Sequence, residues 1–349
     1  MDKIICSQCG AESKAHNKYC TACGYELPNV QAAVAETASD NYALEFHGTG
    51  SEYFGIVIVN WLLTICTLGI YYPWARARTR KYMYGSTSFA GDRFAFHGTG
   101  KEMFIGMLKL YALIFVFFFI VGLFTALKHP YVGIIILYLG IFALMPLAIH
   151  GAYRYRMSRT SWRGIRFGYR GNRNEFLWKC LKWIGLTVIT FGIYNAWMTI
   201  NMRKYLIGNI RMGDVEAKYN GDGYDFFWLC LKGYFLTIIT LGIYSFWWYR
   251  DLFDYYIDGI TLQKGDRCIR FSSTATAGKV FNLAVGNFLI VVLTLGIGFA
   301  WAEIRQMRFL LNNIHLEGDI DLLTLQQTED NYSDATGADA ADFFDFDLF

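Results

Sequence analysis

Long apolar runs alternate with shorter basic and aromatic stretches along most of the chain. Four of the runs end in a Gly-Ile-x-x-x-Trp motif, at residues 69–74, 192–197, 242–247 and 296–301. A motif of aromatic and small residues opens each unit, at residues 46–50, 96–100, 167–171, 219–223 and 271–275. Such internal repetition indicates that one structural unit was multiplied, here five times.

Each unit is predicted to contain four elements in a fixed order. The apolar run forms a helix, which breaks at the glycine because glycine is unfavourable inside a helix. A stretch rich in arginine and aromatic residues, such as 74–84 or 301–311, is predicted to form an amphipathic helix on the membrane surface. A β-hairpin follows, with its turn expected at Gly91-Asp92, Arg163-Gly164, Gly213-Asp214, Gly265-Asp266 or Gly318-Asp319. The five hairpins should pair into a small sheet outside the bilayer.

The second unit is longer because it contains two apolar runs, residues 103–127 and 131–149, joined by Lys128, His129 and Pro130. Runs of this length cross a bilayer, so these two are predicted to form a transmembrane hairpin with a short turn on the far side. The predicted fold class is a mainly α-helical membrane protein. It is built from repeated units of apolar helix, glycine break, amphipathic helix and β-hairpin, with a small N-terminal zinc ribbon.

The composition also indicates a membrane protein. Hydrophobic residues make up 54% of the chain and charged residues 17%, whereas a soluble domain averages about 25% charged residues. The net charge of +3 is too small to suggest nucleic acid as a partner. No secretory signal precedes the first apolar run, so the first 50 residues are expected to stay in the cytoplasm.

The basic stretches that follow the runs present a topological problem. If each single run crossed once, these stretches would alternate between the two sides of the membrane. Residues 76–81 would then lie outside, against the tendency of lysine and arginine to remain in the cytoplasm. We therefore predict that the single-run units enter the membrane and return at the glycine, around a central cavity that covers the irregular backbone. Ordinary alternation with six spans is the competing interpretation.

Four cysteines near the start have the spacing of a zinc site: Cys6, Cys9, Cys20 and Cys23. Each Cys-x-x-Cys pair can chelate one side of a tetrahedral zinc ion, and four thiolates form a closed structural site. A ribbon this short has no core, so zinc would supply most of its folding free energy. Two disulfides are the alternative, which a cytosolic location disfavours.

These patterns divide the chain into four segments. Residues 1–27 are predicted to form the zinc ribbon, residues 28–43 a flexible linker, and residues 44–327 the repeat-built integral membrane domain. Residues 328–349 contain seven acidic residues and no lysine or arginine, and they are predicted to be a disordered tail. This tail could be a docking peptide or could fold back on the chain's own basic face.

One polar residue recurs inside the apolar runs. Asn60, Lys182, Lys232 and Asn287 each lie six places after a phenylalanine, and Lys109 lies five places after one. An ionisable residue inside a membrane usually faces a cavity, a partner or the interface. Two interpretations stay open: a shared intramembrane polar column, or lysine side chains that snorkel to the interface.

Candidate catalytic residues are few. His47 and His97 lie in the two Phe-His-Gly-Thr-Gly copies, but later units replace them, which favours a structural turn. Asp251, Asp254 and Asp258 share one helical face, which is expected to be solvated or paired with arginine. No nucleophile elbow, zinc-protease motif or phosphate loop occurs in the sequence. The sequence therefore does not predict an enzyme.

The repeated Phe-His-Gly-Thr-Gly, Thr-Leu-Gly-Ile-Tyr-x-x-Trp and Arg-Lys-Tyr motifs lie between residues 44 and 325. Together they resemble the YjgN-like inner-membrane proteins of bacteria. The resemblance implies a location in the bacterial inner membrane. It implies no catalytic residues, because the function of that family is unknown, and the zinc ribbon is an addition to it.

Two functions are considered for such a multi-pass protein with a cytoplasmic ribbon. The first is a transporter or channel-like module, and the second is a scaffold that recruits partners through the ribbon and the acidic tail. Convergence of the polar column on a watery cavity would favour the first. The expected partners are the lipid bilayer and a cytoplasmic protein, a homo-oligomer stays open, and the expected cofactor is structural zinc.

Overall fold

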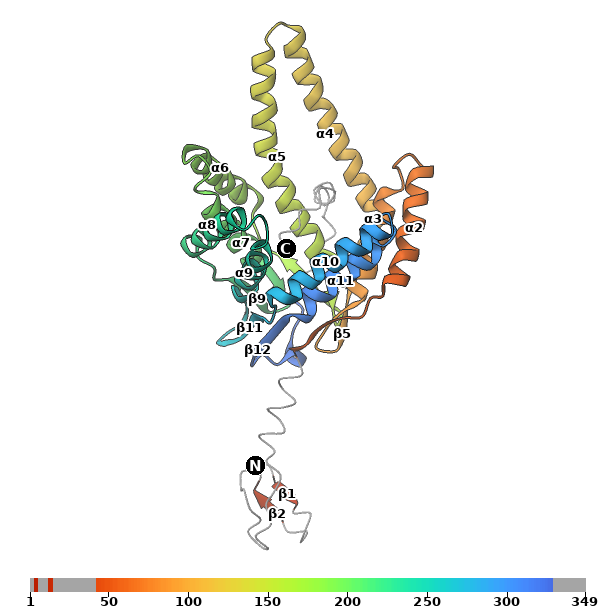
Figure 1. Cartoon of the computed structure of the whole chain (residues 1–349), viewed down its shortest axis with the longest axis vertical. Helices are drawn as coiled ribbons and strands as arrows, with labels where there is room; N and C mark the ends of the chain where they lie inside the picture. Colours follow the sequence, from red (N-terminus) through yellow and green to blue (C-terminus); the bar gives the residue numbers. More distant parts are fainter. Residues whose placement is uncertain (1–2, 6–11, 15–41, 329–349) are drawn as a thin grey trace. The chain divides into compact units, whose positions relative to one another are not determined.

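The computed structural model describes residues 3–5, 12–14 and 42–328. The chain divides into two compact units, Met1–Ala43 and Leu44–Phe349 (Figure 1). In the first unit, β1 (Lys3–Ile5) pairs with β2 (Glu12–Lys14) in an antiparallel hairpin. The hairpin brackets the first predicted Cys-x-x-Cys pair, which itself lies outside the described residues, as do most of the linker and residues 329–349 of the tail.

The second unit contains five pairs of helices, each joined by a short turn. The pairs are α2 (Gly50–Cys66) with α3 (Tyr72–Gly85), α4 (Gly100–Ala126) with α5 (Pro130–Ser158), α6 (Arg173–Ile189) with α7 (Asn195–Gly208), α8 (Gly223–Ile239) with α9 (Ser245–Asp258), and α10 (Ala277–Leu293) with α11 (Phe299–Asn312). The N-cap side chain of every first helix accepts a backbone N–H of the first turn. This bond satisfies a donor that has no partner within the helix.

Ten strands connect the helix pairs. They are β3 (Leu44–Phe46), β4 (Thr87–Phe89), β5 (Asp92–Phe96), β6 (Thr160–Trp162), β7 (Ile165–Tyr169), β8 (Ile210–Met212), β9 (Val215–Tyr219), β10 (Ile260–Lys264), β11 (Arg267–Ser273) and β12 (Ile314–Gly318). All ten form one antiparallel sheet in sequence order from β3 to β12. Every helix pair therefore leaves this sheet and returns to it, so the strands of all five units lie at the same end of the pairs.

The helix pairs form a closed ring. The second helix of each pair packs against the first helix of the next pair, and α11 of the last pair packs against α2 of the first (Figure 1). Strand β3 lies against α11, as β5 lies against α3 and β9 against α7. The first strand of the ring thus completes the fifth unit, although β3 and β12 remain the two unpaired edges of the sheet.

The turns inside the single-run pairs satisfy their own backbone. In the first pair the N–H groups of Leu68, Gly69 and Ile70 donate to carbonyls of residues 64–67, and the N–H of Tyr71 donates to Thr67 Oγ1 at 3.0 Å. Leu68 and Gly69 both have positive φ, at 50° and 90°. The turn therefore pairs its own N–H groups, and no described segment covers its tip, where Leu68 is 95% exposed. The central cavity around these turns stays a prediction.

The stretches predicted as surface helices are helical, as expected. Helix α3 packs between α2 and α4 and also against β5. Its aromatic and small residues fill the space between neighbouring units, whereas the sequence pattern alone indicated only that one face was apolar. Helix α3 thus has protein partners on several sides, while Arg78 and Lys81 remain exposed. Its location on the membrane surface stays a prediction.

Four of the five predicted hairpins form, with two-residue turns between β4 and β5, β6 and β7, β8 and β9, and β10 and β11. The first turn is Ala90-Gly91, one residue earlier than predicted, because Asp92 already belongs to β5. The fifth, expected at Gly318-Asp319, was wrong: β12 ends there, and no later strand pairs with it in the described part of the chain. Residues 319–328 instead run across the neighbouring hairpin turns. Lys264 Nζ donates to the carbonyl of Thr324 at 2.9 Å, and Thr328 Oγ1 donates to that of Gly213 at 2.5 Å.

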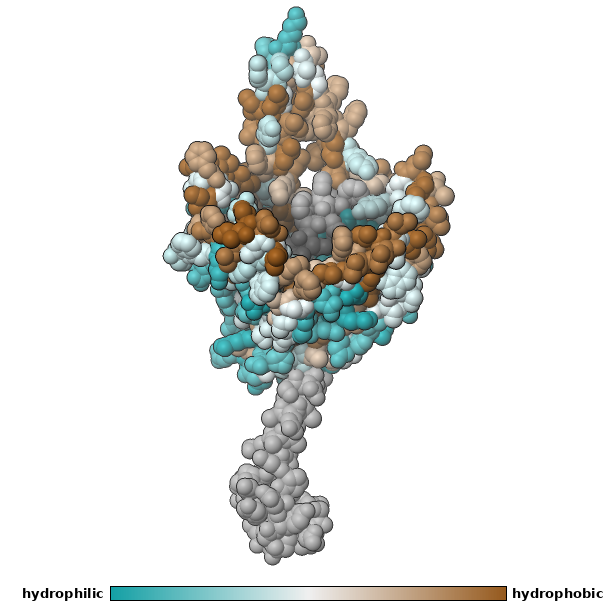
Figure 2. Space-filling view, viewed as in Figure 1, coloured by the Kyte–Doolittle hydropathy of each residue, from teal (hydrophilic) through white to brown (hydrophobic). Residues whose placement is uncertain are grey.

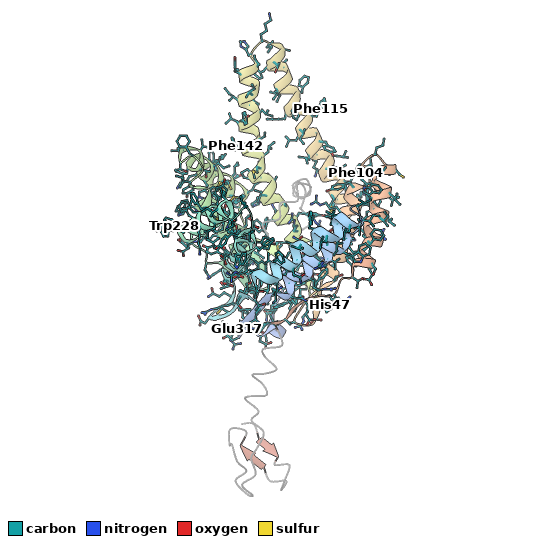
Figure 3. All side chains as sticks on the ribbon, in the orientation of Figure 1. His47, Phe104, Phe115, Phe142, Trp228 and Glu317 are labelled. Atoms are coloured by element: carbon teal, nitrogen blue, oxygen red, sulfur yellow. The ribbon has the colours of Figure 1, made fainter. Side chains whose placement is uncertain are left out.

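Helices α4 and α5 extend well beyond the other pairs (Figure 1). With 27 and 29 residues, they are the two described helices that are long and apolar enough to cross a membrane. Side chains on this hairpin are exposed, such as Leu139 at 64% and Phe115 at 71%, the latter labelled in Figure 3. Hydrophobic colour covers most of this hairpin below its hydrophilic far tip and also the tips of the shorter pairs, while the sheet end is hydrophilic (Figure 2).

Candidate functional site

The repeated tryptophan and glycine motifs meet at the boundaries between units. A Cβ atom at Gly100 would lie 2.4 Å from the ring of Trp74, and one at Gly223 would lie 2.3 Å from the ring of Trp197. At Gly50 the nearest atom of Trp301 would be 2.2 Å away. Since Trp301 belongs to the last pair and Gly50 to the first, the same contact that joins neighbours also closes the ring.

In three of the five pairs, a tyrosine ties the second helix to the N-cap residue of its own first helix. The hydroxyl of Tyr205 accepts from the N–H of Asn172 and donates to its carbonyl, both at 2.9 Å. Tyr82 and Tyr255 make the same pair of bonds with Thr49 and Asp222. The recurring Arg-Lys-Tyr motif was the sequence signal for this contact, but its spacing from the N-cap becomes meaningful only in the folded pair.

The structure gives the members of the predicted polar column different surroundings. The side-chain amides of Asn60 and Asn287 each donate to a carbonyl fifteen residues later, of Ala75 at 3.1 Å and Ala302 at 3.2 Å, and so join the two helices of a pair. Three lysines of the column, on α4, α6 and α8, are instead exposed: Lys109, Lys182 and Lys232. The asparagines thus make structural bonds within their own helix pairs.

The predicted zinc ligands Cys6, Cys9, Cys20 and Cys23 lie outside the described residues. Within residues 3–5, 12–14 and 42–328, no group of three or more His, Cys, Asp or Glu residues is arranged to hold a metal ion. The acidic face of α9 is paired with arginine, as the sequence predicted: Arg250 contacts Asp251 at 2.6 Å and Asp254 at 3.5 Å.

The two histidines form repeated contacts with serine. His47 Nε2 lies 2.9 Å from Ser88 Oγ, and His97 Nε2 lies 2.7 Å from Ser161 Oγ. Glu45 also approaches His47, but at the same nitrogen, at 3.5 Å. A catalytic triad needs the serine and the acid on opposite ring nitrogens, so the arrangement matches a contact between adjacent strands rather than a relay.

A stripe of arginines on the second helices was not recognised from the sequence. On α3, Tyr82 faces α2 through its bond to Thr49, and Ala77 faces α4 through its contact with Met103. Successive residues of a helix are rotated by about 100° around its axis. On this basis Arg76 and Arg80 both lie on one of the two sides of α3 that face neither α2 nor α4. The exposed Arg78 and Lys81 lie on the other side.

The same face of the other second helices carries two further arginines. Arg80 and Arg203 both lie six residues before the C-cap of their helix, and Arg156 lies three residues before its own, one turn further along. Arg203 is 2% exposed, whereas the next residue, Lys204, is exposed. A closed ring has one enclosed and one open side, so we assign the arginine stripe (Arg76, Arg80, Arg156 and Arg203) to the inside.

The surroundings of the arginine stripe are aromatic and apolar. The guanidinium of Arg203 lies 3.5 Å from the ring centroid of Tyr256 on α9, a cation–π contact in a buried position. On α11, Glu303 stands at the helical position that Arg76 has on α3, and it forms a hydrogen bond with Tyr53. Four arginines against one glutamate at these helical positions give the inside of the ring a positive potential.

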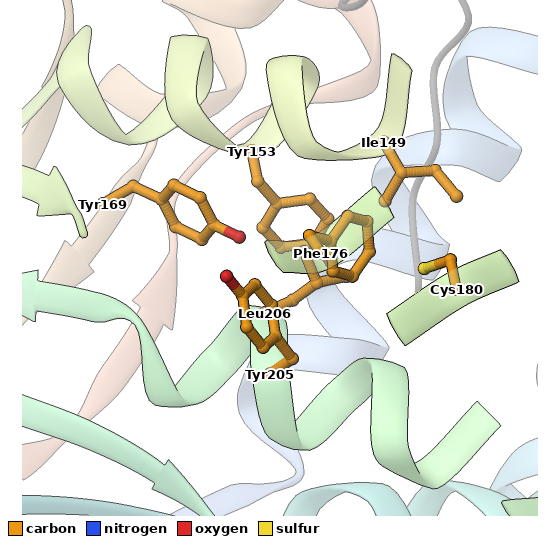
Figure 4. Packing of buried hydrophobic residues seen from close by; sticks show 7 residues of the cluster. All are labelled: Ile149, Tyr153, Tyr169, Phe176, Cys180, Tyr205 and Leu206. Atoms are coloured by element: carbon orange, nitrogen blue, oxygen red, sulfur yellow. The ribbon is translucent and has the colours of Figure 1, made fainter. Parts of the chain in front are cut away.

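An apolar core and a cavity lie next to this stripe, between α5, α6 and α7. Tyr153, Phe176 and Leu206 pack there with four further residues (Figure 4). Towards the turn between α6 and α7, a cavity of about 200 Å³ is lined by side chains such as Met145 and Met202. Its lining is almost entirely apolar, so it offers no path for an ion.

The segment that crosses the hairpin turns is held by a charged clamp. Lys264 Nζ contacts Asp214 at 2.8 Å, and the N–H of Gln326 donates to the same carboxylate at 3.3 Å. Partial burial raises the pKa of Asp214, but the hydrogen bonds from Lys264 and Gln326 outweigh it and lower this pKa overall. The carboxylate therefore stays charged at neutral pH and fixes residues 319–328 across the sheet.

A closed ring of helix pairs on one sheet, with one apolar hairpin among the described residues that is long enough to cross a bilayer, defines a mostly helical membrane protein. The chain belongs to a family of bacterial proteins of unknown function, DUF898, whose model matches residues 41–233 and 248–343. The inner membrane protein YjgN of Escherichia coli strain K12 is 37% identical over 139 residues, 40% of this chain and 33% of the relative.

A second relative is the inner membrane protein YjgN of Salmonella typhimurium strain LT2. It is 32% identical over 146 residues, which cover 42% of this chain and 35% of the relative. The matched segment thus spans about a third of the length of these curated relatives. Their names support a location in the bacterial inner membrane, and no solved structure matches the chain.

Proposed function

We propose that this protein is a non-enzymatic binding scaffold of the inner membrane and not a pore. The observation that carries the proposal is that two helices in the described part of the chain are long enough to cross, and they form one hairpin. A pore needs a continuous wall of membrane-spanning segments. One hairpin anchors a protein but does not enclose a channel.

The shorter helix pairs then insert only part of the way. Helix α2 has 17 residues against 27 in α4, so the long hairpin extends about 15 Å further from the sheet. Both the 17-residue length and the exposed apolar tips fit entry into the bilayer and return to the same side. The sheet, the ribbon and the acidic tail would all lie in the cytoplasm, which agrees with the basic residues near the sheet.

The ribbon supplies one contact point of the proposed scaffold. The four cysteine thiolates match a closed tetrahedral zinc site in which the metal stabilises the fold. The pairing of β1 with β2, which flank the first Cys-x-x-Cys pair in the sequence, supports this arrangement.

A transporter or channel-like module is the second candidate, and the arginine stripe is the observation that favours it. Arginines inside a ring can conduct or select anions. A solute path would have to continue across the membrane between copies of the chain, because the described part of one copy provides one spanning hairpin.

Electrical recording from planar bilayers that contain the purified chain separates the two functions. The scaffold proposal expects no chloride or phosphate conductance, from the wild type or from Arg203→Gln. An anion conductance that Arg203→Gln removes, while Lys204→Gln keeps it, would contradict the scaffold. The zinc site is tested on the same preparations, since one zinc ion per chain is expected in the wild type and its loss in Cys9→Ser.

A further inference from the structure

The cavity of about 200 Å³ between α5, α6 and α7 is used by neither proposed function. Its wall on α5 consists of Phe142, Met145, Pro146 and Ile149. Its wall on α6 consists of Cys180, Ile184, Thr187 and Val188. Within each set the residues recur at helical spacing, so they share one face of their helix. With one turn of α7 they enclose a space that extends along the helices for roughly 10 Å.

The chemistry of the lining matches a hydrocarbon. Among the described residues that form the wall, Thr187 alone carries a hydroxyl, and this group donates to the carbonyl of Trp183 in its own helix at 2.8 Å. A water molecule in a cavity needs about two to four polar partners, which this lining does not offer. Apolar cavities of about 150 Å³ stay free of water and take up benzene. A ligand for this larger cavity is therefore an apolar molecule or chain.

The cavity extends from a buried end to the apolar surface of the protein. Ile149 and Cys180, both labelled in Figure 4, are buried, and Cys180 is 2% exposed. Met145 and Val188, farther along the two helices, are exposed, and Val188 reaches 63%. Helix α5 is one of the two helices long and apolar enough to cross a membrane. The open end of the cavity is therefore continuous with the surface that contacts the acyl chains of the bilayer.

The boundary between α5 and α6 also lacks the tryptophan–glycine contact of other boundaries. Trp74, Trp197 and Trp301 each lie twelve residues before the C-cap of their helix. The same position on α5 is Leu147, which directly follows Pro146 of the cavity wall. The first residue of α6 is Arg173, where the glycine that receives the tryptophan stands at the start of α2, α4 and α8. Protein side chains thus fill this boundary less completely.

We propose that the cavity binds an acyl chain of a phospholipid from the surrounding bilayer. An unfilled cavity forfeits the dispersion contacts of its lining. A lipid chain restores them and leaves no more favourable solvent, because the bilayer interior is as apolar as the cavity. The bound chain fills the boundary between the spanning hairpin and the shorter pair α6–α7. The inference rests on the entry of α5 and α6 into the bilayer, and it holds for a scaffold or a transporter.

Photochemical crosslinking tests the site in the full chain. The protein is placed in phosphatidylcholine nanodiscs that contain a phosphatidylcholine with a diazirine in one acyl chain, and crosslinks are located by mass spectrometry after irradiation. We expect crosslinks on Ile149 and Cys180, which lipid outside the cavity cannot contact because both are buried. Ile189, exposed and outside the cavity wall, reports the lipid around α6. Crosslinks on Ile189 without any on the two buried residues would overturn the proposal. Absence of crosslinks on all three would contradict the entry of α6 into the bilayer, and the site with it.

Two isoleucines of α6 provide matched variants. Ile184→Trp fills the cavity, whereas Ile189→Trp adds the same ring outside it. Crosslinking of Cys180 should fall about tenfold or more in Ile184→Trp, because the ring takes the volume of the chain, and should stay unchanged in Ile189→Trp. Met145→Trp narrows the exposed end of the cavity, so it serves if Ile184→Trp fails to fold. Equal crosslinking of Cys180 in the wild type and in both cavity variants would refute the site.

Discussion

A single hydrogen atom in place of a side chain decides how neighbouring units meet. Gly50, Gly100 and Gly223 leave room for a tryptophan ring that otherwise would overlap a Cβ atom. The sequence showed both motifs, glycine at the start of one helix and tryptophan after the break of another. It did not show that they touch, because the two residues of each pair belong to different units, and Trp301 and Gly50 belong to the last and the first unit in the sequence.

Gly50→Ala should therefore destabilise the ring, whereas Gly55→Ala on the same helix should not. The added Cβ of Gly50→Ala overlaps Trp301, and overpacking costs about 1–3 kcal/mol. Nothing lies within 4 Å of a Cβ at Gly55, where alanine is expected to stabilise the helix by about 0.4–1 kcal/mol. Thermal unfolding in detergent compares the two variants, and a Gly50→Ala protein as stable as the wild type would contradict the interlock.

At the scale of elements, the periodicity of the sequence predicted most helices and their breaks. Four hairpin turns were also predictable, because Gly-Asp or Arg-Gly between alternating residues has few other conformations. The fifth hairpin was not, since the same Gly-Asp pair at residues 318–319 precedes a segment without strand character. In the folded protein, the strand that packs against α11 is β3, which lies far away in the sequence.

The polar residues of the apolar runs are the element-scale test. Asn60→Ala removes a buried hydrogen bond between α2 and α3 and leaves the carbonyl of Ala75 without it, which should cost about 1–3 kcal/mol. Lys182→Ala changes an exposed side chain and should stay within about 0.5 kcal/mol. Urea unfolding curves of both variants measure the difference in unfolding free energy. An equal loss of stability in the two would mean that Lys182 also makes a structural contact, which would contradict this prediction.

At the scale of the whole molecule, one sheet collects all five units at one end. This arrangement requires the single-run helix pairs to return to the side from which they enter, and it leaves the turn between α4 and α5 as the farthest point from the sheet (Figure 1). If the long hairpin crosses the inner membrane, this turn alone among the described turns faces the periplasm.

Thiol labelling of intact cells tests this topology. Single cysteines replace His129 in the far turn and Asp266 in the β10–β11 turn, both exposed, on a background without the four cysteines outside the ribbon. A membrane-impermeant maleimide should label the His129→Cys protein in intact cells and the Asp266→Cys protein only after the membrane is opened. Arg93→Cys and Glu317→Cys, also exposed, should behave as Asp266→Cys does. Labelling that alternates from unit to unit would support six separate spans.

The sequence by itself determined the local order of this protein. Hydrophobic runs, glycine breaks and turn residues act over a few neighbouring positions, so helices, breaks and four hairpins could be predicted from them. The tertiary structure decided which residues face each other across units: the closed ring, the tryptophan–glycine contacts, and the arginines on its inside. These depend on contacts between residues tens or hundreds of positions apart, and helical periodicity alone cannot distinguish a face that meets lipid from one that meets another helix or encloses charge.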